Sequence, residues 1–318
     1  LDYFIALKIY KTRQKRVAKI LFISAVIGNL LLLGYYKYSG FFVENIANVT
    51  EFDTSSWTFV KNVLLPVGIS FITFQRISYL IDVYRRKIIP TKNIIHYATY
   101  ASLFPHLLSG PIVRFSHIKE QLTKRLIDDK TIFDATKFLS IGLALKILIA
   151  NQLYPVEETI IQNFAHIHTT ETLILIFFFT FRIYFDFLGY SFIAIGLAKF
   201  LGFDFPMNFN SPYQAKSMTE FWQRWNMTLS QWLRDYLYIP LGGNRRGNIM
   251  TYCNLFNTML LGGLWHGASW NFVLWGGFHG VILAIERFLS QRSIPIKIPS
   301  IVAKLITFFL VMIGWMLF

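Results

Sequence analysis

A long apolar stretch of the sequence carries an ionisable side chain, His266, where such a group is costly. The run from Leu255 to Gly280 contains no Asp, Glu, Lys or Arg, but it includes His266 and, further along, His279. An ionisable group inside an apolar segment of membrane length is by default a candidate functional residue. Because imidazole can accept a proton from a hydroxyl group, we predict that His266 is a general base. A histidine in an apolar helix can also serve only as a structural hydrogen-bonding group, and the residues alone leave this alternative open.

The remaining histidines and the single cysteine do not predict a metal site. His266 and His279 are 13 residues apart, which would separate them by about 220° around a single helix and make them poor co-ligands. His166 and His168 lie in a polar segment without a cysteine or a close carboxylate partner, so we expect both to be solvated. The lone Cys253 excludes a cysteine-based zinc site and a disulfide framework. We therefore expect no bound metal and no permanently bound cofactor.

A glycine- and arginine-rich turn, Leu241–Gly247, is a candidate binding site for a phosphorylated donor. Glycines let the backbone approach a phosphate closely, and arginine guanidinium groups bind phosphate through two parallel hydrogen bonds. Such a turn suits a donor such as coenzyme A, although a simple basic loop beside a membrane has the same composition. The residues that we predict to bind the donor are Arg234, Arg245, Arg246, Gly242, Gly243 and Trp225.

The stretch that precedes this turn, residues 217–240, has aromatic side chains at close to helical spacing. These are Phe221, Trp225, Trp232 and Tyr236. Periodicity alone favours an amphipathic helix at the membrane interface, with an aromatic belt and arginines that extend toward water. A role in donor binding is the alternative, and the sequence leaves both open.

The composition is that of an integral membrane protein. Of the 318 residues, 54% are hydrophobic and only 15% are charged, against roughly 25% charged residues in soluble domains. The net charge of +14 is concentrated in short loops beside apolar segments, as the positive-inside rule predicts. We therefore expect the lipid bilayer, and not nucleic acid, to be the partner of this basic chain.

Apolar segments and loop charges together predict an all-α fold with several membrane-spanning helices. The expected spans cover residues 20–36, 59–83, 133–152 and 173–201, a hairpin of 249–265 and 269–286, and a last span from about 301. Acidic loops, with Glu51, Asp53 and Glu157, are expected outside, and basic loops are expected in the cytoplasm. Arg182 and Asp186 are spaced i,i+4 and are predicted to pair along one helix face inside the bundle.

Residues 93–113 break the alternation of inside and outside loops. The segment is apolar and contains Pro105, Gly110 and Pro111, and both of its flanks are basic. Broken backbone at membrane depth is tolerated only where it is buried in protein or lines a cavity. We predict a re-entrant segment in which His106 could face the same cavity as His266.

The sequence shows no internal repeat and no low-complexity linker, so we predict one membrane domain over residues 1–318. The chain begins in the middle of an apolar pattern and stops inside the apolar run 308–318. We expect it to have been cut from a longer protein at both ends.

Several stretches between about residues 60 and 290 together resemble the membrane-bound O-acyltransferase (MBOAT) family. They are Leu65–Gln75 with Tyr79 to Tyr84, Phe104–Ile112, Asp186–Tyr190, Phe205 to Tyr213, Glu220–Asn226, Trp232–Gly243 and Gly263–Gly267. The resemblance is to the bacterial branch that acetylates alginate or peptidoglycan, with the D-alanylating enzymes of lipoteichoic acid as more distant relatives. It implies a bundle of many helices around a tunnel, with re-entrant and cytoplasmic amphipathic helices.

The resemblance also implies roles for single residues. The family's invariant histidine falls on His266, and its second polar position falls on Asn226. Alginate-type members usually have histidine at that second position, and asparagine cannot act as a base. This departure fits a single imidazole at His266, with Asn226 orienting it or polarising the acyl carbonyl. His106 matches a histidine of the bacterial branch and is the third candidate.

The function that the resemblance implies is the movement of acetyl groups from acetyl-CoA across the bacterial inner membrane. The acceptor would be a cell-envelope polysaccharide, reached with the help of a periplasmic SGNH-type transferase or another acceptor protein. Two alternatives remain open on the sequence. One is a transporter or flippase for a polysaccharide precursor, in which Arg182, Asp186 and His266 line a conduit. The other is a non-catalytic scaffold for a periplasmic transferase.

Overall fold

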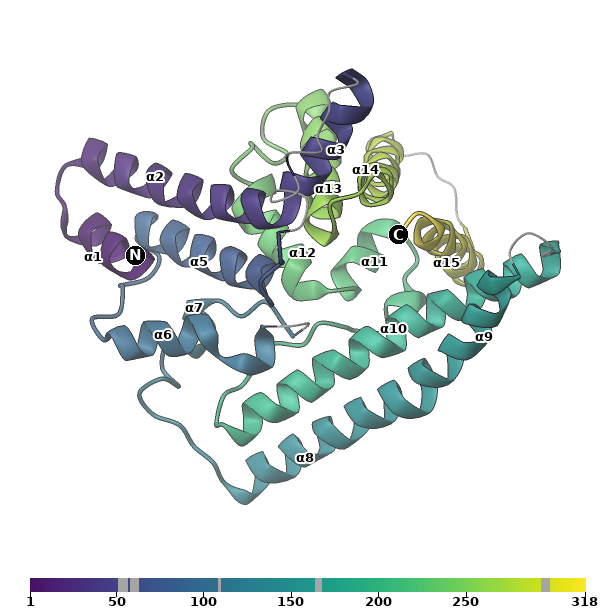
Figure 1. The fold of residues 1–318 in the computed structure, drawn as a ribbon, viewed down its shortest axis with the longest axis horizontal. Coiled ribbons are helices and arrows are strands. Elements are labelled where there is room, and N and C mark those ends of the chain that lie inside the picture. Colours follow the sequence, from purple (N-terminus) through teal and green to yellow (C-terminus); the bar gives the residue numbers. More distant parts are fainter. Residues whose placement is uncertain (51–56, 58–62, 108–109, 164–167, 293–297) are drawn as a thin grey trace. The chain divides into compact units, whose positions relative to one another are not determined.

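The structure is a computed structural model that describes residues 1–50, 57, 63–107, 110–163, 168–292 and 298–318 (Figure 1). The described residues form helices and connecting turns and contain no β-strand, as predicted. The predicted outer residues Glu51 and Asp53, the predicted start of the second span at 59–62 and His166 lie outside the described residues.

The chain divides into two compact units. The N-terminal unit comprises Leu1–Leu108, Ile112–Lys124 and Gly267–Ser269. The C-terminal unit comprises Ser109–Pro111, Arg125–His266 and Trp270–Phe318. His266 and Asn226 therefore belong to one unit and His106 to the other.

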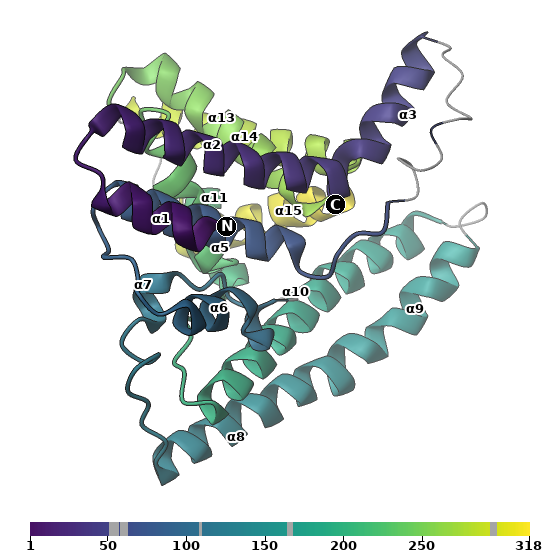
Figure 2. The same ribbon diagram turned by 60° about the vertical axis from the view of Figure 1, so that its left-hand side comes forward.

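Three helices of the N-terminal unit, α1 (Asp2–Lys11), α2 (Lys15–Leu33) and α5 (Ile69–Tyr84), lie side by side (Figure 2). A π-helical turn, η1 (Gly34–Tyr38), continues α2 into α3 (Ser39–Thr50). The elements that follow α5 are short: α6 (Ile94–Ser102), the 3-10 turn η3 (Phe104–His106) and α7 (Phe115–Ile118).

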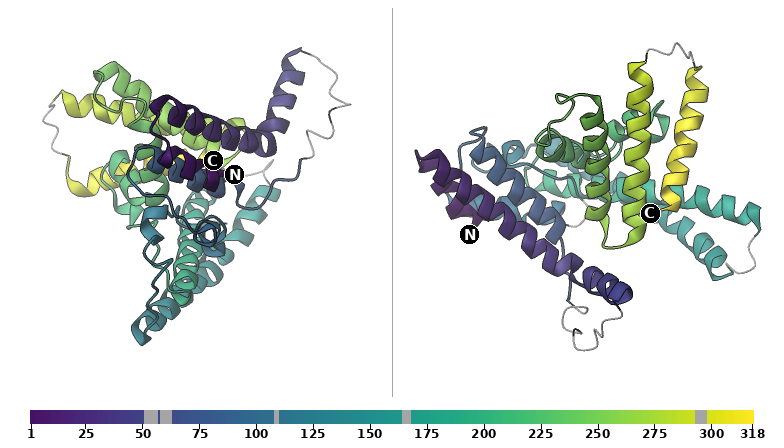
Figure 3. Two further views of the ribbon diagram at one scale, coloured as in Figure 1. Left: turned by 90° about the vertical axis from the view of Figure 1, so that its left-hand side faces the viewer. Right: turned by 90° about the horizontal axis from the view of Figure 1, so that it is seen from above.

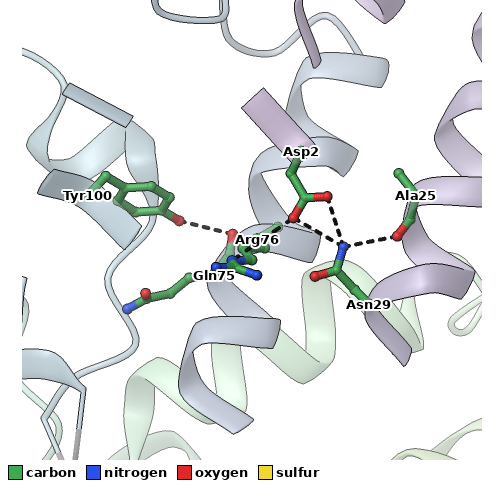
Figure 4. Close-up of polar contacts among 7 residues, drawn as sticks. Asp2, Ala25, Asn29, Gln75, Arg76 and Tyr100 are labelled. Atoms are coloured by element: carbon green, nitrogen blue, oxygen red, sulfur yellow. Dashed lines mark hydrogen bonds and ion pairs between the residues drawn. The ribbon is translucent and has the colours of Figure 1, made fainter. Parts of the chain in front are cut away.

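A buried polar network ties α1, α2 and α5 together (Figure 4). The Asn29 side-chain amide donates to both carboxylate oxygens of Asp2 at 3.2 Å and to the carbonyl oxygen of Ala25 at 2.9 Å. The Arg76 Nε lies 4.0 Å from the same carboxylate, and the Tyr100 hydroxyl donates to the Gln75 carbonyl oxygen at 3.0 Å. Since a buried carboxylate without partners is costly, this network fixes how the helices are aligned.

The broken segment predicted at 93–113 is present as α6, η3 and extended backbone. Pro105 lies in the first turn of η3, where its missing N–H costs little. The turn packs on the start of α5, because a Cβ at Gly68 would lie 2.5 Å from the carbonyl oxygen of Leu107. Gly68 also has a left-handed φ of 73°. Glycine is therefore required both by this backbone conformation and by the lack of space for a Cβ. Two of the family-like stretches thus meet within the N-terminal unit.

The C-terminal unit begins with a helical rod that lies against one very long helix (Figures 1 and 2). The rod consists of α8 (Asp129–Ala144), the π-helical turn η4 (Leu145–Ala150) and α9 (Asn151–Gln162), and the long helix is α10 (Thr169–Phe200). A Cβ at Gly142 would lie 2.7 Å from the Gly189 carbonyl oxygen, and one at Gly196 would lie 2.8 Å from the Ala135 carbonyl oxygen. Small residues thus let the two backbones approach closely, as is common between membrane helices.

The predicted pairing of Arg182 with Asp186 is wrong. The Arg182 Nε lies 2.7 Å from the Glu157 carboxylate, and the Lys146 ammonium lies 2.6 Å from the Asp186 carboxylate. Arg182 and Asp186 of α10 thus both pair with residues of the rod. Glu157 is the counter-charge of Arg182, and Lys146 is the counter-charge of Asp186. Charges inside an apolar bundle are tolerated when they are paired, and pairs between helices also join the rod to α10.

The predicted amphipathic helix over 217–240 is broken into three short elements. These are α11 (Met218–Arg224), α12 (Met227–Leu233) and the π-helical turn η7 (Arg234–Tyr238), and the 3-10 turn η6 (Pro212–Gln214) precedes them. The aromatic side chains expected to form a belt are instead buried: Phe221, Trp225, Trp232 and Tyr236 are each at most 7% exposed. They pack inside the unit.

The predicted helical hairpin is present as α13 (Asn248–His266) and α14 (Trp270–Gln291), and α15 (Ser300–Met316) follows (Figure 3). Gly263 and Gly276 allow the backbones of α13 and α14 to approach closely. A Cβ at Gly276 would lie 2.5 Å from the Met259 carbonyl oxygen, and one at Gly263 would clash with the Phe272 carbonyl oxygen. Among the described residues, three helical stretches are long and apolar enough to cross a membrane: Lys15–Thr50, Thr169–Phe200 and Trp270–Gln291.

Gly276→Ala should destabilise the folded protein, because the new methyl group has no room between α13 and α14. Overpacking of this kind costs about 1–3 kcal/mol, and we expect a lower melting temperature in detergent. Gly277→Ala is the matched control, since the nearest atom that its Cβ would meet among the described residues lies 3.9 Å away, on the Phe256 ring. Equal melting temperatures for the two variants would contradict the proposed packing.

Candidate functional site

His266 is the last residue of α13 and lies among aromatic rings. Its imidazole is half-buried, with ring-centroid distances of 5.1 Å to Trp275, 5.1 Å to Phe318 and 6.3 Å to Phe272. These rings come from α14 and from the end of the chain after α15. The surroundings restrict water around the imidazole and hold it in one orientation, as a catalytic base requires.

His279 lies in the same aromatic cluster, although the sequence places it 13 residues away. The prediction that separated the two histidines assumed a single helix, whereas the hairpin brings both against Trp275, at 5.1 Å for His266 and 4.7 Å for His279. His279 is only 1% exposed, and a Cβ at Gly314 of α15 would lie 2.9 Å from its Nε2. The described residues hold no group of three His, Cys, Asp or Glu side chains arranged to bind a metal ion.

An open groove of about 940 Å³ lies between the α11–η7 segment and the second half of α14. Its polar and charged lining includes Arg234, Asn244, Glu286 and Arg287, and Trp222 and Leu283 contribute apolar walls. A groove of this size with a few polar groups is typical of a small-molecule site. Its arginines make it suitable for a ligand that carries negative charge.

Two indole rings connect this groove to His266. Trp222 lines the groove and lies 5.6 Å from Trp275, measured between ring centroids, and Trp275 lies 5.1 Å from His266. A ligand in the groove is therefore separated from the candidate base by two packed side chains. The groove and the histidine thus lie in the same unit, on either side of the packed Trp222 and Trp275 rings.

Glu286 fixes the wall of the groove by joining α14 to α11. Its carboxylate accepts hydrogen bonds from the backbone N–H groups of Met218 and Thr219 and from the Thr219 hydroxyl. The first N–H groups of a helix have no partner within the helix, so a carboxylate at this position stabilises it. The contact holds Trp222, on the same short helix, in place.

A second carboxylate, Glu220, stabilises the same helix from its own first turn. It accepts from the Lys216 N–H at 2.7 Å and from Arg224, while the Ser217 hydroxyl accepts from the Glu220 N–H. The Lys216 backbone hydrogen bond, followed by the Arg224 guanidinium, holds the pKa of Glu220 below its ordinary value. The carboxylate thus stays charged and keeps α11 capped.

The predicted donor-binding residues divide into two groups. Arg234 lines the groove, and its Nε donates to the Asp235 carboxylate at 2.8 Å, a bond that raises the pKa of Arg234. Arg245 and Arg246 are exposed beside the groove and are absent from the lining found among the described residues. Trp225 is buried in the core, 3% exposed, with its ring 4.9 Å from Trp315.

Gly242 and Gly243 form the predicted flexible turn. Their φ angles of 117° and 55° are in the region that favours glycine. The Gly243 carbonyl oxygen accepts from the Asn254 side-chain amide at 3.0 Å, which anchors the turn to α13. The turn therefore sets the position of the segment between η7 and α13, and a direct contact with the donor stays a prediction.

Asn226 forms the break between α11 and α12. It is 3% exposed and has a left-handed φ of 40°, which asparagine tolerates better than most side chains. The break is held on both sides, because the Met227 N–H donates to the Asn208 carbonyl oxygen and the Asn210 N–H donates to the Arg224 carbonyl oxygen. This backbone requirement accounts for an asparagine here, and a role toward the acyl carbonyl remains a prediction.

His106 is completely buried in η3 of the N-terminal unit. Its role in catalysis, like the tunnel that the family resemblance implies, therefore stays a prediction.

The sequence profile of the family described as "MBOAT, membrane-bound O-acyltransferase family" matches residues 84–318. This range contains the groove, the hairpin and the histidine cluster. The chain belongs to the membrane-bound O-acyltransferase family. It is accordingly an all-α membrane protein, as the sequence predicts.

Curated relatives span the bacterial branch of this family. The probable alginate O-acetylase AlgI of Pseudomonas aeruginosa is 43% identical over 322 residues, covering 100% of this chain and 61% of the relative. The peptidoglycan O-acetyltransferase of Helicobacter pylori is 35% identical over 348 residues, covering 100% of this chain and 65% of the relative. The teichoic acid D-alanyltransferase of Streptococcus thermophilus is 28% identical over 249 residues, covering 73% of this chain and 60% of the relative. The chain thus spans about three fifths of the length of these relatives.

Sequence reasoning missed Trp222, Trp275 and Glu286. A usable signal existed for Trp275, since its i,i+4 spacing to His279 places both on one face of a helix. Glu286 is the first acidic residue after the uncharged run, but only the fold shows that it caps α11. Trp222 lay within a family-like stretch, where nothing in the spacing distinguished it from Trp225.

Asn226→Ala should lower the stability of the protein by about 1 kcal/mol, because alanine is strained in the left-handed conformation. Asn226→Gly removes the same side chain but accepts this conformation, so its melting temperature in detergent should stay close to that of the original protein. If alanine and glycine destabilise the protein equally, the side chain matters and the backbone explanation is wrong.

Proposed function

We propose that the protein is a membrane O-acyltransferase that moves acetyl groups from acetyl-CoA toward a cell-envelope polysaccharide. The observation that supports this most directly is the connection of His266, through Trp275 and Trp222, to a groove lined by arginines. The names of the relatives support the acetyl group and the polysaccharide acceptor, since one is an alginate O-acetylase and another acetylates peptidoglycan.

The proposed reaction is acyl transfer with His266 as the general base. The imidazole takes the proton of an acceptor hydroxyl while the hydroxyl oxygen attacks the carbonyl carbon of the thioester. The carbon–sulfur bond then breaks, and the thiolate of coenzyme A leaves with the proton from the imidazolium. A single imidazole is sufficient for both proton transfers, so the mechanism does not depend on a second histidine at position 226.

The groove is proposed to bind the coenzyme A part of the donor from the cytoplasmic side of the inner membrane. Arg234 and Arg287 line it and can bind phosphate. The basic turn with Arg245 and Arg246 follows directly and carries further positive charge. This charge also fits the cytoplasmic location that the positive-inside rule predicts for the segment.

The acceptor is proposed to be a hydroxyl group of an envelope polysaccharide, either peptidoglycan or an alginate-like exopolysaccharide. Transfer to the polymer would proceed through a periplasmic SGNH-type transferase or another acceptor protein. Asn226 and His106 are also proposed as catalytic residues, Asn226 toward the acyl carbonyl.

His266→Ala in the full-length protein should abolish acetyl transfer in membranes supplied with radiolabelled acetyl-CoA. Loss of a general base lowers the rate by about 10²–10⁴, whereas the amount of folded protein should not change. His96→Ala, at a half-buried histidine of α6, is the control and should leave transfer intact. Acetyl transfer at the original rate by His266→Ala would refute the proposed base.

Arg287→Gln should raise the KM for acetyl-CoA roughly tenfold with little change in kcat, because it removes a binding charge remote from the reacting atoms. Arg292→Gln is the matched control, since Arg292 is not among the residues that line the groove and its guanidinium lies 4.2 Å from the centroid of the Phe288 ring. The same KM for both variants would argue against donor binding in the groove.

One experiment distinguishes a transporter from an acyltransferase. Purified protein that neither hydrolyses nor transfers the acetyl group of acetyl-CoA, but moves a polysaccharide precursor across vesicles, would support the transporter.

A further inference from the structure

Trp222, which lines the groove, packs against two further rings that lie behind it, Trp275 and His279. Trp222 and Trp275 lie 5.6 Å apart between ring centroids, Trp222 and His279 lie 5.2 Å apart, and Trp275 and His279 lie 4.7 Å apart. All three contacts are edge-to-face. We refer to these three residues as the ring triad. They come from two elements, α11 and α14, which Glu286 joins.

Each member of the ring triad carries a buried nitrogen without a hydrogen-bond partner among the described residues. These atoms are the Trp222 Nε1, the Trp275 Nε1 and the His279 Nδ1. The three residues are only 8%, 1% and 1% exposed. Buried polar atoms are nearly always hydrogen-bonded, and a group left without a partner is costly. Three such atoms in mutually contacting rings are therefore candidate donors to a bound ligand.

The chemistry of these nitrogens selects the kind of ligand. An indole N–H can only donate, so two indoles require an acceptor atom, and an imidazole Nδ1 can donate in one of its tautomers. The surroundings are apolar, since the ring triad belongs to a hydrophobic cluster with Phe221, Leu283 and Trp315. A phosphate would need a counter-charge in such a place. A neutral carbonyl oxygen fits it better.

We propose that the ring triad binds the carbonyl oxygen of the donor's thioester, an inference that rests on the proposed acyl transfer. Trp222 lines the groove in which the donor would bind, and Trp275 contacts His266 at 5.1 Å. A carbonyl held by the ring triad thus lies between the donor groove and the base. When the hydroxyl oxygen attacks, the carbonyl oxygen gains negative charge, and preorganised N–H donors stabilise it.

Gly314 of α15 defines one side of the ring triad. A Cβ at this position would lie 2.9 Å from the His279 Nε2, so glycine lets α15 approach the edge of the imidazole. The approach restricts the imidazole to its observed place against Trp222 and Trp275. His279 is therefore a positioning residue for the two indoles as well as a candidate donor.

The test replaces each indole by a ring that lacks the N–H group, in the full-length protein. Trp222→Phe and Trp275→Phe should each lower kcat for acetyl transfer by 10-fold or more, with KM for acetyl-CoA changed less than 3-fold, as expected when a donor to the developing oxyanion is lost. Their melting temperatures should fall much less than the loss in kcat would suggest, because neither substitution removes a hydrogen bond between described residues. Trp232→Phe is the control for tryptophan size, since Trp232 is also buried but does not line the groove.

If phenylalanine impairs folding, β-(3-benzothienyl)alanine at position 222 keeps the shape of the indole and lacks only the N–H group. A kcat equal to that of the original protein for this variant would overturn the proposal, as would equal losses in Trp222→Phe and Trp232→Phe. Both outcomes would indicate that the ring triad is only packing.

Binding of an unreactive donor separates this proposal from the proposed function. The original protein should bind S-acetonyl-CoA, which retains a ketone oxygen, more tightly than free coenzyme A. The preference should disappear in Trp222→Phe and persist in Trp232→Phe. A preference that survives in Trp222→Phe would refute the ring triad as the carbonyl site even if acetyl transfer is confirmed. Absence of acetyl transfer by the original protein, with the preference intact, would instead refute the proposed function.

Discussion

The close approach of α13 and α14 is the constraint on which the candidate site depends. Gly263 and Gly276 leave no space for a side chain between the two helices, so their backbones pack directly against each other. As a result, His266 at the end of α13 lies against Trp275 of α14, and His279 lies one turn further on. In a membrane, where apolar side chains gain little by leaving lipid, such backbone contact is a main source of helix association.

The same helix α14 also organises the groove. Glu286 caps α11 and thereby holds Trp222 between the groove and the histidine cluster. Ion pairs between helices, Arg182 with Glu157 and Lys146 with Asp186, hold the long α10 to its neighbours. The charged residues of this apolar chain thus serve mainly to join elements, and the proposed chemistry is left to neutral rings and one half-buried imidazole.

Much of the fold could be predicted from the sequence, because apolar length and loop charge are local properties. The hairpin around His266, the final helix and the broken segment that contains His106 were all predicted in this way. Partners across helices could not be predicted: Arg182 has a counter-charge at i,i+4, but the fold offers Glu157 instead. The break at Asn226 was missed for a similar reason, since the aromatic period continues through a residue whose left-handed backbone interrupts the helix. The candidate site was predicted at His266, whereas Trp222 and Trp275 became visible only when the groove and hairpin were in place.

The central claim is that His266 takes the proton of the acceptor hydroxyl. Acetyl transfer by full-length His266→Ala in proteoliposomes, measured with and without added imidazole, tests this most directly, because the space left by the side chain can admit a free imidazole. If His266 is the base, no transfer occurs without imidazole, and transfer increases with the imidazole concentration. Full transfer without imidazole would contradict it, and so would a loss that imidazole leaves unchanged in a protein that still binds the donor.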